Sequence, residues 1–126
     1  MTDRSDTVND ALRFIDADVV VDVDRPKGSR HPAYGFVYPL NYGFVPGTMS
    51  GDGEPIDAYV LGPDEPLSRF EGRCVAVVVR EEEDDPKLVV VRPGDDPTDD
   101  EILEQVEFQE QFFSSSIVRG RAPTAS

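Results

Sequence analysis

The sequence is short of the residues that build disulfide frameworks and transition-metal sites. Its 126 residues include one cysteine, Cys74, one histidine, His31, and no tryptophan. A single cysteine excludes an internal disulfide, as is usual in a reducing compartment. One histidine and one cysteine also exclude a zinc finger and a three-histidine zinc site. We therefore expect one domain held by its hydrophobic core, because a chain of ~100–150 residues needs no covalent staple.

Positive charge is also scarce. Twelve lysines and arginines face 26 aspartates and glutamates, which gives a net charge of -14, and only two of the twelve are lysines. Nucleic-acid backbones and anionic membrane surfaces bind through a basic footprint, so this balance argues against both as partners. Such an acidic surface suits a salt-rich cytoplasm, and an ordinary acidic protein from a GC-rich genome is the alternative.

Long hydrophobic runs are absent. The longest clean apolar run is residues 75–79, far below the ~18 residues of a membrane span, and the acidic N-terminus does not resemble a secretory leader. The sequence therefore predicts a cytoplasmic protein that forms a single domain over residues 1–126, with residues 1–6 and 119–126 flexible.

Hydrophobic patterning predicts a mainly β protein. Helical spacing favours a short helix at residues 7–15, and β-branched runs predict strands at 19–24, 58–61, 73–80 and 87–92. The last two strands flank the acidic residues 81–86 and are typical of a hairpin with an acidic tip. Residues 26–55 lie between the first and second of these strands. They combine prolines and glycines with aromatic rings, which predicts an ordered loop and a short edge strand.

One helix is predicted near the C-terminus. Thr98 is a good N-cap, and Glu101 three residues later completes a capping box. An apolar stripe follows at helical spacing, consisting of Ile102, Leu103, Val106, Gln109, Phe112 and Phe113. Several strands followed by one amphipathic helix indicate a small β-barrel with a covering helix.

Residues 52–57, with the sequence DGEPID, carry three carboxylates on a turn that Gly53 and Pro55 stiffen. Clustered carboxylates supply the oxygen ligands that Mg²⁺ prefers, although a solvated acidic turn is the plain alternative. The spacing does not fit an EF-hand, because its twelfth position falls on Pro63. The acidic residues 81–85 are a second candidate source of metal ligands.

Other catalytic patterns are missing. The sequence has no G-x-S-x-G motif, P-loop or dinucleotide fingerprint. Cys74 begins an apolar strand, so we expect it to be buried rather than nucleophilic.

Two blocks resemble the core signature of the family I soluble inorganic pyrophosphatases. They are residues 38–48 (YPLNYGFVPGT) and residues 52–57, at the family's spacing. Residues 21–26 (VDVDRP) and 85–89 (DPKLV) resemble two further strands of the family, so the resemblance covers roughly residues 19–113. The segment 28–32 (GSRHP) is similar to a short branch of the family.

The resemblance implies an OB-like five-stranded β-barrel with a C-terminal covering helix, which binds Mg²⁺ and hydrolyses pyrophosphate to two phosphates. Mn²⁺ or another divalent cation is the alternative cofactor, and a small phosphate compound is the implied substrate. The metal ligands by this match are Asp52, Asp57, Asp85, Glu82 and Asp24. The general base is Glu54, and the substrate-binding residues are Tyr42, Lys87, Arg30 and Lys27. Family members assemble, so a homo-oligomer is compatible with the resemblance.

The chain also departs from the family pattern. Glu54 stands where an aspartate is usual, the hairpin before residue 38 is short, and a phosphate-binding Tyr-Lys pair falls at about Ser116-Ile117. These differences leave two alternatives open. One is a pyrophosphatase-like barrel that binds metal and phosphate, or a protein partner, without catalysis, and the other is an acidic barrel with no site.

Overall fold

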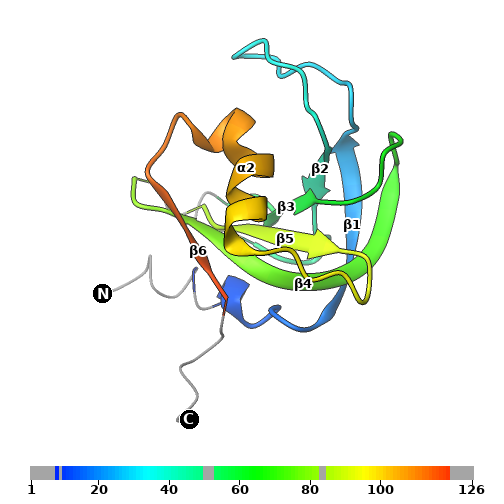
Figure 1. The fold of residues 1–126 in the computed structure, drawn as a ribbon, viewed down its shortest axis with the longest axis vertical. Helices are drawn as coiled ribbons and strands as arrows, with labels where there is room; N and C mark the ends of the chain where they lie inside the picture. Colours follow the sequence, from blue (N-terminus) through cyan, green and yellow to red (C-terminus); the bar gives the residue numbers. More distant parts are fainter. Residues whose placement is uncertain (1–7, 9, 50–52, 83–84, 120–126) are drawn as a thin grey trace.

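Five strands close into a barrel. The computed structural model describes residues 8, 10–49, 53–82 and 85–119. The strands are β1 (Asp18–Arg25), β2 (Asn41–Phe44), β3 (Asp57–Val60), β4 (Arg69–Arg80), β5 (Lys87–Val91) and β6 (Ser115–Val118). Their order is β1-β2-β3-β5-β4-β6, and the ring closes because β4 also pairs with β1. The predicted five-stranded barrel is confirmed (Figure 1).

Strand β4 is long enough to take part in three pairings. Its first residues pair with β1, its middle with β5, and its last four residues, Val77 to Arg80, with β6. The predicted hairpin is confirmed by the antiparallel β4–β5 pairing, and residues 83–84 of its acidic tip lie outside the described residues. Strand β6 follows the helix and was not predicted from the sequence, because four residues of Ser, Ile and Val carry too weak a pattern.

Strand β2 corrects one prediction. It was expected as a short edge strand, but it pairs with β1 on one side and with β3 on the other. Pro39 and Pro46 flank the strand rather than interrupt it, so its backbone donors remain available for pairing. At Gly43 the chain passes so close to β1 that a β-carbon would overlap the carbonyl oxygen of Asp22, and only glycine fits there.

The predicted helix is confirmed at its start and is shorter than predicted at its end. Helix α2 runs over Asp99–Glu110 with the Thr98–Glu101 capping box formed, whereas Phe113 lies beyond the helix. At the N-terminus, residues 8 and 10–12 are helical and residues 13–16 form turns, so the predicted helix at 7–15 ends three residues early, and its residues 7 and 9 lie outside the described residues. Among those residues, no helix has the length and apolar character needed to cross a membrane.

The apolar residues form two clusters on opposite faces of the sheet. Alternate residues of β5 enter different clusters, Leu88 and Val90 one and Val89 and Val91 the other, which explains why this strand is apolar throughout. Helix α2 covers the second cluster with Ile102 and Val106. Because α2 packs there, its last residues reach two strands of the barrel. Gln109 contacts Tyr59 of β3, and Glu110 contacts Arg80 at the end of β4.

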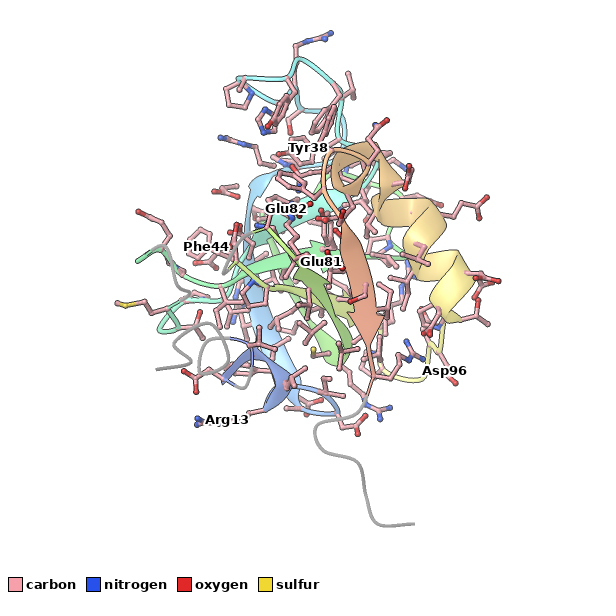
Figure 2. All side chains as sticks on the ribbon, turned by 90° about the vertical axis from the view of Figure 1, so that its left-hand side faces the viewer. Arg13, Tyr38, Phe44, Glu81, Glu82 and Asp96 are labelled. Carbon is pink, nitrogen blue, oxygen red and sulfur yellow. The ribbon has the colours of Figure 1, made fainter. Side chains whose placement is uncertain are left out.

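Between β1 and β2, residues 26–40 project from the barrel as an arm (Figure 1). Backbone hydrogen bonds hold it as a small hairpin, with Arg30 and Val37 forming an isolated bridge. Figure 2 shows Tyr38 at the base of this arm, beside the C-terminal end of α2. The arm therefore stands over the same end of the barrel that the tip of α2 approaches.

Candidate active site

A cavity of about 290 Å³ lies where the arm, the strand ends and α2 meet. Each of the strands β1 to β5 contributes at least one lining residue, and the arm and the C-terminal part of α2 complete the wall. The lining residues are Asp24, Arg25, His31, Tyr34, Tyr38, Tyr42, Asp57, Arg80, Lys87, Gln109 and Phe113.

A buried lysine joins two carboxylates in this cavity. The Nζ of Lys87 lies 2.7 Å from Asp57 Oδ2 and 2.8 Å from Asp85 Oδ2. The parallel register that places Asp57 beside Lys87 on neighbouring strands creates the first contact. Burial by itself lowers the pKa of Lys87, but the charges of Asp57 and Asp85 outweigh it and raise that pKa, so the ammonium stays charged.

Tyr42 fixes the orientation of Asp57. Its hydroxyl donates a hydrogen bond of 2.9 Å to Asp57 Oδ2, the oxygen that Lys87 also contacts. Burial, and next the charge of Asp57, raise the pKa of Tyr42 well above its usual value. The phenol therefore remains a hydrogen-bond donor at neutral pH and holds the carboxylate in place.

A second buried pair supports the other side of the cavity. Arg80 donates through Nε to Glu110 Oε1 at 3.0 Å and through Nη2 to Oε2 at 2.8 Å. Glu110 also accepts from the hydroxyls of Tyr59 and Ser115, each at 2.5 Å. The guanidinium carbon of Arg80 lies 3.7 Å from the centre of the Phe113 ring. These contacts hold the Arg80 guanidinium in one orientation, because two parallel hydrogen bonds to one carboxylate fix the plane of the group.

The charge of the cavity differs from that of the whole molecule. Three of the lining residues are cations, Arg25, Arg80 and Lys87, and two are carboxylates, Asp24 and Asp57. Burial raises the pKa of Asp24, although the neighbouring Arg25 opposes that shift. Because Asp85 and Glu110 pair with Lys87 and Arg80, these cations are locally balanced, and the cavity is far less negative than the chain as a whole with its net charge of -14.

A family model described as inorganic pyrophosphatase matches residues 16–117. The chain belongs to the inorganic pyrophosphatase family. The inorganic pyrophosphatase of Aeropyrum pernix is 47% identical over 57 residues, which cover 44% of this chain and 32% of that protein. The one from Saccharolobus solfataricus is 42% identical over 67 residues, which cover 49% of this chain and 39% of that protein. The matched segments thus span between 32% and 39% of the length of these curated relatives.

Solved structures agree on the fold. The inorganic pyrophosphatase of Ehrlichia chaffeensis superposes with a TM-score of 0.63 at 21% identity, over 79% of this chain and 83% of that one. The enzyme from Neisseria gonorrhoeae gives a TM-score of 0.58 at 23% identity, over 86% and 84% of the two chains. At these identities the likeness establishes a shared barrel architecture.

The structure brings five of the predicted site residues together. Four of them, Asp24, Tyr42, Asp57 and Lys87, line the cavity, and Asp85 contacts Lys87 at its edge. They converge because adjacent strands of the barrel end at the same rim. Asp52 lies outside the described residues.

Four other predicted site residues do not line the cavity. Arg30 donates to the carbonyl oxygen of Gly35 within the arm at 2.6 Å, and the Nζ of Lys27 lies 4.0 Å from Asp64. The carboxylate of Glu82 accepts the backbone N–H of Ser114, and Glu54 is exposed on its turn. Family position alone did not indicate these local contacts.

Sequence reasoning missed Arg25, Arg80 and Glu110. Arg25 and Arg80 each end a β-strand, and the sequence offered no sign that both turn into one cavity. Glu110 did give a signal, because it lies four residues after Val106 on the buried face of α2. A carboxylate on a buried stripe requires a partner inside the fold.

The described residues suit a hard divalent cation in part. Asp57 Oδ2 and Asp85 Oδ2 converge on one positively charged point, now held by the Lys87 ammonium, and Asp24 lines the same cavity. Carboxylate oxygens are the donors that Mg²⁺ takes. Within residues 8, 10–49, 53–82 and 85–119, no three acidic, histidine or cysteine side chains form a ready metal cluster.

Proposed function

We propose that this chain hydrolyses inorganic pyrophosphate to two phosphates with the help of Mg²⁺. One observation carries the proposal: the carboxylates of Asp57 and Asp85 meet the buried Lys87 in a cavity that Arg25 and Arg80 also line. This arrangement supplies both oxygen ligands for a divalent cation and cations for a polyanion. The membership of the chain in the pyrophosphatase family supports the same reaction.

Each residue has a proposed role. Asp57, Asp85, Asp24 and Asp52 hold the metal, Glu54 accepts a proton from the attacking water, and Arg25, Arg80 and Lys87 hold phosphate oxygens. When bound, Mg²⁺ lowers the pKa of a coordinated water and neutralises phosphate charge. Tyr42 keeps the carboxylate of Asp57 oriented through its 2.9 Å hydrogen bond. Arg30, Lys27 and Glu82 do not line the cavity and are not carried into this set. Glu54 does not line it either, and its proposed role, like that of Asp52, rests on its position in the family signature.

Asp57→Asn tests the proposal with little change in side-chain volume. We expect phosphate release from pyrophosphate, in excess Mg²⁺, to fall at least about a hundredfold, since even residues that only orient metal ligands cost 10–100-fold. The matched control is Asp95→Asn, an exposed acid paired with Arg92 at 3.8 Å. The control should keep full activity, and both variants should be assayed at low and at molar salt, because the acidic surface repels itself at low salt.

A folded wild-type chain that releases no phosphate at either salt concentration would contradict the proposal.

The second candidate function, binding without catalysis, has one observation in its favour. The Lys87 ammonium occupies the point where Asp57 and Asp85 converge, so a lysine competes with the metal for these oxygens. Calorimetry that detects binding of Mg²⁺ and pyrophosphate by an inactive wild type would support this second function.

A further inference from the structure

The cavity has an aromatic side as well as a charged side. His31 and Tyr34, both on the arm, line it together with Tyr38 at the arm's base. The His31 ring centre lies 4.8 Å from that of Tyr34, and Tyr34 stacks on Phe112 at 4.7 Å with an angle of 8° between the ring planes. The aromatic side is therefore a continuous group of rings that joins the arm to the end of α2.

Much of this aromatic surface faces solvent. Tyr34 is 55% exposed and Phe112 is 48% exposed, although both rings are large and apolar. Contiguous exposed aromatic surface beside a cavity marks a binding region. Pyrophosphate is a bare polyanion that binds through charge and hydrogen bonds, so it makes no use of such a wall.

His31 presents a neutral ring to the cavity. Its Nδ1 accepts the backbone N–H groups of Ala33 and Tyr34, both at 3.0 Å. An acceptor nitrogen with two donors resists protonation, and burial, with help from the charge of Arg25, lowers the pKa of His31. The planes of the His31 and Tyr34 rings are inclined at 43°, so a nucleobase can stack on one of the two rings and contact the other with its edge.

The charged side lies within the same cavity. Arg25, Arg80 and Lys87 line it with His31 and Tyr34, so one ligand touching both sides would need phosphates at one end and a flat ring at the other. The volume of about 290 Å³ is near the lower limit of ~300 Å³ for pockets that hold small organic ligands. A nucleoside diphosphate has this combination of charge and flat aromatic surface.

We propose that the cavity also takes nucleoside diphosphates, with the base against Tyr34 and His31 and the phosphates toward Arg25, Arg80 and Lys87. This inference rests on the proposed function. In the reaction, the oxygen of water bonds to the terminal phosphorus while the bond from that phosphorus to the bridging oxygen breaks. The electron pair of the broken bond leaves on the nucleoside monophosphate, and the proton lost by water passes to Glu54, the proposed general base, and from there to solvent. The products are nucleoside monophosphate and phosphate.

Two non-hydrolysable ligands separate base recognition from catalysis. One is the methylene-bridged analogue of ADP, and the other is methylenediphosphonate, which has the bridged phosphorus groups but no base. Calorimetry in excess Mg²⁺ should show that the wild type binds the ADP analogue about tenfold more tightly, within the range that one stacked base contributes. Tyr34→Ala should remove this preference and leave methylenediphosphonate binding unchanged, and Tyr34→Phe should keep the preference.

The matched control is Val37→Ala, another exposed residue of the arm that does not line the cavity. This variant should bind both ligands as the wild type does. The rate of ADP hydrolysis relative to that of pyrophosphate should fall in Tyr34→Ala and stay at the wild-type ratio in Val37→Ala.

Equal wild-type affinity for the two analogues would overturn the inference and leave the proposed function intact. An equal loss of both ligands in Tyr34→Ala would also overturn it, because the rings would then serve only to anchor the arm. If Tyr34→Ala changed the sedimentation coefficient without changing the binding of either analogue, the inference would also be overturned. The rings would then belong to an interface between copies of the chain. If neither analogue binds to the folded wild type and pyrophosphate is not hydrolysed, the proposed function and this inference fail together; if pyrophosphate is hydrolysed, only this inference fails.

Discussion

Glu110 is the residue on which the orientation of Arg80 depends. Its carboxylate is buried and accepts hydrogen bonds from Arg80, Tyr59 and Ser115. Burial by itself raises the pKa of this carboxyl, but those three partners outweigh it, and the pKa of Glu110 lies below its usual value. The negative charge is therefore retained inside the fold, where removal of one partner of a buried pair costs about 3 kcal/mol or more.

We expect Glu110→Gln to lower the free energy of unfolding at pH 7 by about 3 kcal/mol. The difference between wild type and variant should be constant above about pH 4.5, the ordinary range of a glutamate. It should shrink as the pH falls through the lower pKa of the folded state, because a protonated Glu110 resembles glutamine. Urea unfolding at several pH values measures this difference.

Glu104→Gln provides the control, because Glu104 is an exposed acid of the same helix. Its substitution should change stability by less than ~0.5 kcal/mol. A gap between Glu110→Gln and wild type that stays constant well below pH 4 would show that the charge of Glu110 is not what stabilises the fold.

At the scale of the element, the two ends of α2 are specified differently. At its start, the Thr98 hydroxyl accepts the N–H of Glu101 at 3.1 Å, and the Glu101 carboxylate accepts the N–H of Thr98 at 2.8 Å. These contacts are local, so the sequence predicted them. The helix ends at Glu110, where the contacts with β4 and β6 are made, and residues distant in the sequence supply those contacts.

Thr98→Ala should lower the free energy of unfolding by about 1 kcal/mol, because the backbone N–H of Glu101 loses the hydroxyl that caps it. Thr98→Ser should restore most of that loss, since serine keeps the hydroxyl. Thermal or urea unfolding of the three proteins measures the effect. Equal stability of Thr98→Ala and the wild type would mean that packing of α2 on the barrel, rather than capping, fixes the start of the helix.

At the scale of the whole molecule, the chain carries a net charge of -14 but concentrates three cations in one cavity. The excess negative charge on the rest of the surface repels itself, and salt screens that repulsion. The cavity, by contrast, depends on short contacts between buried groups, which salt screens much less. The two parts of the molecule should therefore respond differently to ionic strength.

We expect the Tm at pH 7 to rise by about 5 °C between ~0.05 M and ~1 M NaCl, which corresponds to about 1 kcal/mol for a domain of this size. Differential scanning calorimetry measures it. The same comparison near pH 4.2, the isoelectric point, provides the control, because there the net charge is close to zero and the rise should disappear. A Tm that does not respond to salt at pH 7 would show that self-repulsion does not limit stability.

The sequence by itself determined the features that depend on neighbouring residues. The alternating and β-branched runs predicted β1, β3, β4 and β5, and Thr98 with Glu101 predicted where α2 begins. The two signature blocks identified the family, and they include Tyr42 and Asp57, which meet in the cavity. Local backbone preference and motif spacing are properties of a short stretch of chain, so the sequence suffices to predict them.

Only the tertiary structure decided which residues share the site. Arg25 and Arg80 are 55 positions apart in the sequence. They line one cavity because Arg25 pairs opposite Tyr42 of β2, while the last residues of β4 lie beside Lys87 of β5, which pairs with Asp57 of β3. Arg30 and Lys27, although close to Arg25 in the chain, turn to other partners. Whether a charged side chain enters a cavity depends on strand register and on the nearest opposite charge, and contacts between distant segments determine both.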